Sequence, residues 1–356
     1  MSNKTYNQMQ CLRGIAAILV LLFHFAPQLE RYGLSHILPG IGKWGFWGVD
    51  IFFVLSGFVI ALSSERLFGG LDGFKFILKR SLRVFLGYWP ALALWMGAAG
   101  ILGWSINDNK LLVSWFLLSG SMTDYALPIA WSLYYELLFY VVFFALIVLV
   151  APRLRSIVIQ IGASLLLAWC LAWIVFWPED VMAGIQPYRG VLSAYALEFF
   201  AGVFIYKART VLAGCRLAVA PLLMFAFTAL VVGAQSPWFD KIEILRAGTY
   251  GFAAVAVVAA AVCLEGGAYS KALCVIGDSS YSLYLTHIFI INLMTDFVVR
   301  FFGFDSGLGE LTILLTPFIA VVFAIFWYRL IERPIYDKSM SVVAMVSAWR
   351  KPINVT

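Results

Sequence analysis

The amino-acid sequence predicts an all-α integral membrane protein, a polytopic bundle of about ten transmembrane helices with both termini in the cytoplasm. Hydrophobic residues make up 63% of the 356 residues, charged residues only 12%, and the mean hydropathy is +0.91. These values lie far from those of soluble globular proteins. The apolar residues form long runs that repeat along the whole chain, and short charged segments separate the runs.

Each of the ten runs has roughly 17 to 24 residues, enough to cross a hydrocarbon core about 30 Å thick as a helix. A helix satisfies its own backbone polar groups, which lipid cannot do. The runs lie at 11–27, 43–64, 84–104, 129–151, 156–177, 189–206, 216–234, 246–265, 279–300 and 309–331. A further stretch, "LLVSWFLLSG" at 111–120, is too short to span and predicts an interfacial or re-entrant segment.

The basic residues predict the orientation of these helices. With the N-terminus in the cytoplasm, 18 of the 25 Lys and Arg residues fall on the cytoplasmic side. The positive-inside rule favours this arrangement, and an even number of spans then returns the C-terminus to the same side. We therefore interpret the net charge of +6 as a topology signal and expect no nucleic-acid partner.

The pattern predicts one membrane domain over 1–356, with a core at about 8–335 and no appended extracytoplasmic domain. The first apolar run has no small-residue cleavage site, so we expect it to remain in the mature protein as a helix. The five cysteines imply no disulfide framework, and no cysteine pair has the spacing of metal ligands.

Polar residues begin and end the apolar stretch "RGIAAILVLLFH", which runs from Arg13 to His24. Eleven residues make almost three helical turns, so the two side chains share one face and lie about 16 Å apart along the axis. One interpretation is a cytoplasmic anchor and a hydrogen-bonded core histidine. The other is a path through the bundle with a polar group at each end.

Three carboxylates also fall inside predicted spans. Asp50 and Glu136 each lie near the start of a span that enters from the outer side, about 10 Å below that surface and close to the depth of His24. Glu198 lies in the sixth span. Such residues face a bundle interior or a wet cavity and mark function. As alternatives, Asp50 caps a broken helix and the glutamates tie helices together, which for Glu198 is the favoured interpretation.

The cytoplasmic side carries a second polar set. In "KRSLRVFLGYWP", Arg80 and Arg83 are one helical turn apart, which suits a phosphorylated ligand as well as lipid headgroups. The stretch "SSYSLYLTH" gives the ninth span a polar entry that ends in His287. Its place in the span predicts that His287 lies nearer the cytoplasm than His24, and on that basis we expect no metal site.

Six stretches, in this order, resemble the integral-membrane acyltransferase 3 family, whose members O-acylate bacterial surface sugars. They are "RGIAAILVLLFH", "GVDIFFVLSGF", "KRSLRVFLGYWP", "WSLYYELLFY", "SSYSLYLTH" and "IERP". The resemblance covers nearly all of the chain. It implies a multi-pass protein of the bacterial inner membrane. The resemblance also implies that the protein transfers an acyl group, usually acetyl, from cytoplasmic acyl-CoA to a hydroxyl of a glycan such as O-antigen or exopolysaccharide.

The chemistry of the residues agrees with this likeness. A sugar hydroxyl needs a base to take its proton, and an imidazole suits that task. We expect His24 to be the base, with Asp50 or Glu136 as its carboxylate partner, and an acetyl-histidine intermediate is a variant. We expect Arg13, Arg80 and Arg83 to bind the donor, acetyl-CoA.

Three further residues of the ninth span complete the expected donor site, namely Tyr281, Tyr284 and His287. The expected partners are acyl-CoA, a saccharide acceptor in free or lipid-linked form, and the bilayer, while the oligomeric state stays open. The alternative function is a proton-coupled transporter that uses His24, Asp50 and Glu136, although no inverted repeat supports it.

Overall fold

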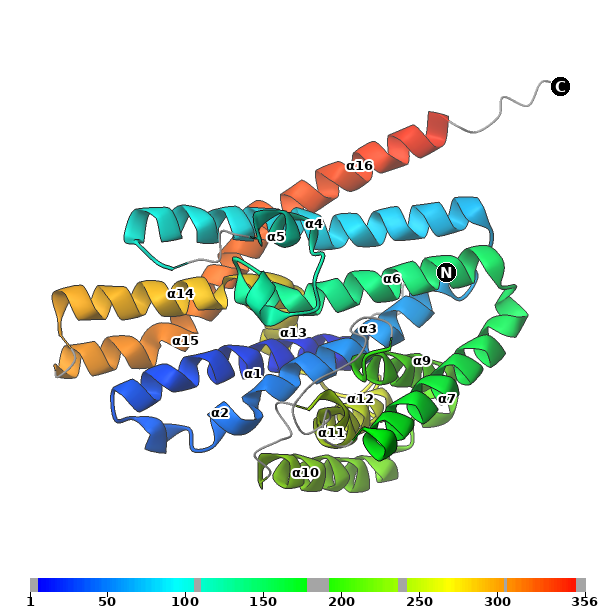
Figure 1. The fold of residues 1–356 in the computed structure, drawn as a ribbon, viewed down its shortest axis with the longest axis horizontal. Helices are drawn as coiled ribbons and strands as arrows, with labels where there is room; N and C mark the ends of the chain where they lie inside the picture. The colour runs from blue at the N-terminus through cyan, green and yellow to red at the C-terminus, as the bar shows by residue number, and fades with distance from the viewer. Residues whose placement is uncertain (1–5, 106–109, 178–191, 236–241, 304–305, 350–356) are drawn as a thin grey trace.

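The computed structural model describes residues 6–105, 110–177, 192–235, 242–303 and 306–349, and within these ranges the chain forms helices and no strands (Figure 1). The longer helices are α1 (Asn7–Arg31), α3 (Gly48–Ser64), α4 (Gly70–Leu102), α6 (Trp131–Leu149), α7 (Pro152–Phe176), α9 (Tyr195–Leu212), α10 (Val219–Gln235), α12 (Phe252–Cys263), α14 (Ser280–Phe301), α15 (Gly307–Trp327) and α16 (Arg333–Trp349). The shorter ones include α2 (Ile41–Trp44), α5 (Leu111–Phe116), α11 (Glu243–Arg246) and α13 (Lys271–Asp278).

The predicted all-α polytopic bundle is confirmed. In the described ranges, nine helical segments are long and apolar enough to cross a membrane, and they coincide with nine of the ten predicted runs. The remaining run, 189–206, corresponds to α9, although residues 189–191 lie outside the described part. Within the stretch at 111–120, Leu111–Phe116 form the short helix α5.

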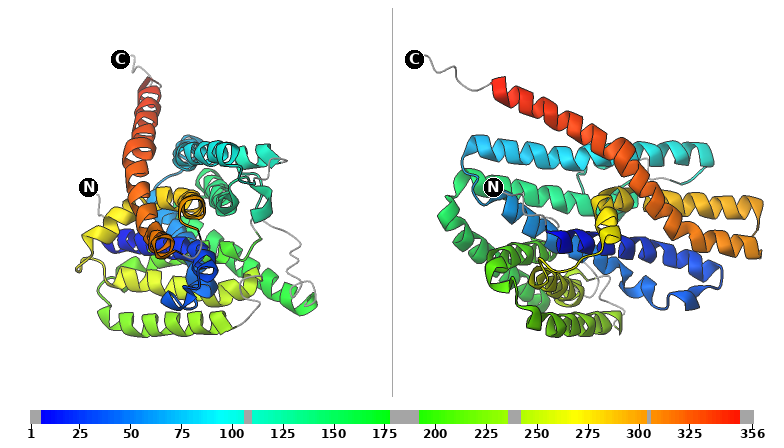
Figure 2. Two further views of the ribbon diagram at one scale, coloured as in Figure 1. Left: turned by 90° about the vertical axis from the view of Figure 1, so that its left-hand side faces the viewer. Right: turned by 180° about the vertical axis from the view of Figure 1, so that it is seen from behind.

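The helices differ in how much protein surrounds them. Helix α3 is the most enclosed, whereas α7 and α10 keep most of their side chains on the outer surface. On α10, Met224 is 71% exposed and Phe227 is 69% exposed. A bilayer covers such apolar surface, so these helices form a lipid-facing side. Helix α16 projects away from the rest of the bundle (Figure 2).

Helices α3 and α9 cross with their backbones in direct contact. A methyl group on Gly57 would collide with the carbonyl oxygen of Phe199, and one on Gly202 would collide with that of Val54. Glycines at such crossings let two helices approach closely. The close approach adds van der Waals contacts between the helices, which stabilise their association in a membrane. The crossing holds α3, and with it one wall of the central cavity described below.

The segment between α4 and α6 folds back onto the bundle. The Tyr88 hydroxyl donates to the carbonyl of Ser114 at 2.7 Å, and the Trp95 indole donates to the carbonyl of Ala126 at 2.7 Å. The Ser114 hydroxyl in turn accepts from the amide of Ala126 at 2.8 Å. Two side chains of α4 thus fix this segment through its backbone.

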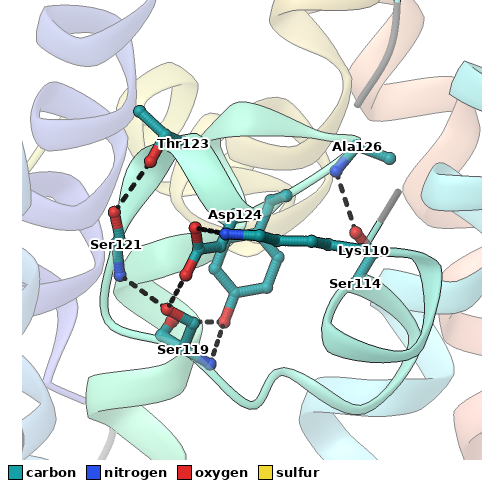
Figure 3. A network of polar contacts seen from close by, with 8 residues as sticks. Lys110, Ser114, Ser119, Ser121, Thr123, Asp124 and Ala126 are labelled. Atoms are coloured by element: carbon teal, nitrogen blue, oxygen red, sulfur yellow. Dashed lines mark hydrogen bonds and ion pairs between the residues drawn. The ribbon is translucent and has the colours of Figure 1, made fainter. Parts of the chain in front are cut away.

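A network of polar side chains stabilises the same segment internally (Figure 3). Asp124 accepts hydrogen bonds from Lys110 at 2.5 Å and from Ser119 at 2.6 Å. The Tyr125 hydroxyl donates to the Ser119 carbonyl, and burial raises the pKa of Tyr125 to about 12, so the phenol stays protonated at neutral pH. These hydrogen bonds therefore give the segment between α4 and α6 a defined structure.

We predict that Gly57→Ala lowers the stability of the bundle, because the added methyl group forces α3 and α9 apart. Overpacking of this kind costs about 1–3 kcal/mol. The midpoint of thermal unfolding in detergent measures the loss. Gly97→Ala is the control, since Gly97 lies on exposed α4 surface with open space around it. Equal midpoints for the two variants would contradict the crossing.

Candidate active site

Six of the residues singled out from the sequence line one central cavity of about 150 Å³. They come from α1, α4, α6 and α14, and α3 supplies most of the apolar wall through residues such as Phe52 and Phe53. These helices lie side by side in Figure 1. The six residues are Arg13, Arg80, Arg83, Glu136, Tyr281 and Tyr284.

A second cavity, of about 480 Å³, adjoins the first and shares Arg80 and Arg83 with it. Lys75 and Lys79 also line this second cavity. Both lysines belong to the same basic run of the sequence as the two arginines, a signal that could have added them to the predicted site. The shared arginines therefore stand where a polar, basic opening meets a smaller interior space.

Arg83 is held in place by residues far away in the sequence. Its Nη1 lies 2.9 Å from Oε1 of Glu332, and the Ser282 hydroxyl donates to Oε2 of the same carboxylate at 2.5 Å. The guanidinium also lies 5.7 Å from the ring centre of Tyr281 and 5.5 Å from that of Tyr336. Glu332 belongs to the "IERP" stretch, so that motif supplies the counter-ion of Arg83.

Arg80 has a looser environment. Its Nη2 donates to the Ser63 hydroxyl at 2.6 Å, and its guanidinium lies 5.7 Å from the ring centre of Tyr140. No described carboxylate forms an ion pair with it. The charge of Arg80 is thus left available to an anion.

Arg13 has no hydrogen bond or ion pair to any residue in the described ranges, although it lines the inner cavity. Glu136 lines the same cavity and accepts a hydrogen bond from Tyr140, one turn along its own helix. This hydrogen bond lies within α6, so it does not connect two helices. Arg13 is half-buried, and a guanidinium without an ion-pair partner inside a membrane bundle is costly, which makes Arg13 a ready partner for a negatively charged ligand.

His24 and His287 are neighbours, and the expectation that they lie at different depths is wrong. Nδ1 of His24 lies 3.2 Å from Nε2 of His287, and the ring centres are 4.9 Å apart. His287 is fully buried, whereas His24 is half-buried. The pair therefore removes the depth argument against a metal site, yet in the described ranges no three His, Cys, Asp or Glu side chains gather to hold one.

The reason lies in where the ninth span begins. Helix α13 packs against the first turns of α1, with Gly277 against the carbonyl of Gln10 and Gly14 close to the carbonyl of Leu273. Helix α14 therefore starts at a depth that α1 has already reached. From Gly14 and Gly277, His24 and His287 are each ten residues farther along the chain.

Tyr284 stands between the cavity and the histidine pair. Its ring lines the cavity and lies 6.0 Å from the ring of His287, centre to centre. Its hydroxyl lies 2.7 Å from the Ser132 hydroxyl and donates to the carbonyl of Ile129 at 2.9 Å. His24 and His287 themselves are not among the residues that line the described cavities.

Asp50 forms a buried ion pair with Arg246. Nε and Nη2 of Arg246 donate to the two carboxylate oxygens at 2.9 Å and 2.7 Å, and both side chains are at most 4% exposed. The guanidinium also lies 4.6 Å from the ring centre of Phe46. The sequence pattern does not predict this pair, because the two residues are 196 positions apart.

Neither Asp50 nor Glu136 makes a hydrogen bond with His24 in the structure, so neither stands where the expected carboxylate partner would be. Glu198 is 3% exposed, and its two oxygens have no hydrogen-bond partner among the described residues. Glu198 lies within electrostatic range of Asp50 and Arg246. It therefore belongs to a buried charge cluster with Asp50 and Arg246.

Comparison with known proteins gives two matches. A family model described as an acyltransferase domain matches residues 6–331. The exopolysaccharide production protein ExoZ of Rhizobium meliloti (strain 1021) is 29% identical over 331 residues, which cover 88% of this chain and 94% of that protein. No solved structure matches the chain significantly.

We predict that Arg246→Leu destabilises the protein by about 3–5 kcal/mol, because it leaves Asp50 buried and unpaired. The double variant Asp50→Asn, Arg246→Gln removes both charges and should recover most of this loss. Thermal unfolding in detergent measures each effect.

Lys110→Ala is the matched control, since it breaks an exposed ion pair with Asp124 that is worth at most about 1 kcal/mol. An Arg246→Leu protein as stable as Lys110→Ala would disprove a structural role for the Asp50 pair.

Proposed function

The chain belongs to the integral-membrane acyltransferase 3 family and is an acyltransferase, and we propose that it moves an acyl group, acetyl above all, from cytoplasmic acyl-CoA to a hydroxyl of a surface or lipid-linked saccharide. The observation that carries the proposal is the gathering of Arg13, Arg80 and Arg83 with two tyrosines of α14 around one cavity. The six ordered motifs that predicted the family also supply these residues.

Donor binding follows from the charges. Coenzyme A carries several phosphate charges on a thin pantetheine arm. The wider cavity, with Lys75, Lys79, Arg80 and Arg83, suits the phosphates, since guanidinium groups bind phosphate oxygens in bidentate fashion. The narrower cavity suits the arm, and we assign Arg13 to the donor because no protein group neutralises it.

Tyr281 and Tyr284 form the aromatic wall along which the arm would lie. Tyr281 is fixed by the hydrogen bond that its hydroxyl donates to the carbonyl of Val84 at 2.7 Å. His287 lies beyond Tyr284 and against His24, so we move it from the donor site, where the sequence put it, to the reacting end.

The chemistry needs a base for the acceptor hydroxyl. In the proposed step, His24 takes the hydroxyl proton as the sugar oxygen forms a bond to the thioester carbonyl carbon. The carbon–sulfur bond then breaks, and the coenzyme thiolate takes the proton from His24 and leaves as the thiol. The products are an acyl ester and free coenzyme A, with all atoms and protons accounted for.

The two carboxylates take indirect roles in this scheme. Glu136 stays in the donor cavity, where it accepts the hydrogen bond of Tyr140 and makes no hydrogen bond or ion pair with Arg13. Asp50 holds α3 through Arg246, and α3 carries the cavity wall at Val49, Phe52 and Phe53. A carboxylate held by two charge-assisted hydrogen bonds is a poor proton carrier, which counts against the transporter alternative.

The acceptor side rests on the relative and on the charge pattern. ExoZ is named for exopolysaccharide production, which supports a saccharide acceptor for this chain. The excess of Lys and Arg on one side supports cytoplasmic termini in a bacterial inner membrane. Donor and acceptor would then reach His24 from opposite sides of the membrane.

We predict that His24→Ala abolishes acyl transfer, because no other group replaces the base. The test is mass spectrometry of surface polysaccharide from cells that carry the variant, in which the mass of one acetyl group per modified unit should disappear. His36→Ala is the matched control, since His36 is exposed in the turn after α1. Retained acetylation in membranes that contain the His24 variant would remove His24 from the mechanism.

We further predict that Arg13→Gln weakens acetyl-CoA binding by about 10-fold or more, the value of one hydrogen bond to a charged group. Thermal stability should not fall, because Arg13 has no protein partner to lose. Calorimetric titration of the purified protein with acetyl-CoA measures the affinity. Arg300→Gln, which removes an exposed charge at the far end of α14, is the control, and equal affinities would overturn the assignment of Arg13.

A further inference from the structure

Each histidine of the pair has one ring nitrogen next to a backbone carbonyl of its own helix. Nδ1 of His24 lies 2.9 Å from the oxygen of Val20, and Nδ1 of His287 lies 3.1 Å from the oxygen of Leu283. A carbonyl oxygen only accepts hydrogen bonds, so both Nδ1 atoms must carry the proton. A neutral imidazole has one N–H, which leaves both Nε2 atoms as lone-pair acceptors.

The contact between the two rings fits these protonation states. Nε2 of His287 lies 3.2 Å from Nδ1 of His24, so a lone pair faces an N–H. The N–H of His24 is therefore shared between the carbonyl of Val20 and the ring of His287. No residue in the described ranges makes a hydrogen bond with Nε2 of His24, whose ring is only half-buried.

We propose that His287 is the positioning residue of the base: it accepts the Nδ1–H of His24 and leaves Nε2 of His24 as the reacting nitrogen. This inference rests on the proposed role of His24 in acyl transfer. His287 then occupies the place at which a carboxylate was expected, since it orients the base and fixes its tautomer.

A neutral partner suits this depth in the membrane. A second imidazole accepts a hydrogen bond without bringing a negative charge into a fully buried position, where an ionised carboxylate is far more costly. When Nε2 of His24 takes the hydroxyl proton, the ring becomes an imidazolium. Its Nδ1–H then points at the lone pair of His287, which stabilises the positive charge until the coenzyme thiolate removes the proton.

The chain contains only three histidines, which makes the tautomers measurable. Nitrogen-15 NMR of protein labelled at histidine distinguishes a protonated ring nitrogen from one with a free lone pair, and His36→Gln removes the third set of signals. We expect two rings with protonated Nδ1 and unprotonated Nε2, and a hydrogen-bond coupling between Nδ1 of His24 and Nε2 of His287. A protonated Nε2 on His24 in the resting protein would overturn the inference.

Two variants test the consequence for the reaction. His287→Leu removes the acceptor at similar volume and should lower kcat by about 10- to 100-fold, the loss of one hydrogen bond to a charged group, while KM for acetyl-CoA stays unchanged. His287→Gln places an amide oxygen near the position of Nε2 and should restore much of kcat. A His287→Leu protein with wild-type kcat, or one that mainly changes KM, would contradict the positioning role.

The proposed base, His24, and the proposed positioning residue, His287, are tested separately. If His24→Ala retains acyl transfer, the proposed base is wrong whatever tautomers the spectra show. If His24 is essential but its Nε2 carries the proton, or His287→Gln is no better than His287→Leu, the base stands and the positioning role of His287 falls. The spectra are recorded on the native side chains, so the test survives even where a His287 variant does not fold.

Discussion

The close contact between α1 and α13 determines where the reacting groups lie. Gly14 and Gly277 let the two backbones touch, and any side chain at either position would force them apart. Because α14 follows α13 after a short break, this contact also sets the depth at which α14 begins. The histidine pair, the tyrosine wall and Ser282 beside Glu332 all lie on or against the first turns of α14 that follow this contact.

Charge compensation divides the buried polar groups into two kinds. Asp50 with Arg246, and Glu332 with Arg83, are paired within ion-pair distance, although Arg83 also lines the cavities. Arg13 has no such partner in the described part of the chain, and Arg80 has only a hydroxyl and two aromatic rings. Paired charges gain their stability from protein groups, whereas the proposed donor would compensate the charges of Arg13 and Arg80.

Much of this arrangement follows from sequence because helical periodicity places residues on faces. The one-turn spacing of Arg80 and Arg83 and the polar entry of the ninth span predicted residues that meet in one cavity with Arg13, namely Arg80, Arg83, Tyr281 and Tyr284. The sequence pattern does not show which residues of different helices lie side by side. Nothing local shows that Arg246 reaches Asp50 or that Glu332 reaches Arg83. The depth of His287 depended on a short helix, α13, that the apolar runs did not include.

Tyr284 has a consequence for the energetics of the membrane itself. Its ring closes the inner end of the donor cavity, and its hydroxyl is engaged by Ser132 and Ile129. A protein that exchanges a substrate between two compartments through a continuous water column would also conduct protons and dissipate the electrochemical gradient. In the proposed reaction, the ring of Tyr284 would let an uncharged acyl group advance by covalent transfer while hydrated ions are retained. The bilayer would then remain an electrical insulator during turnover.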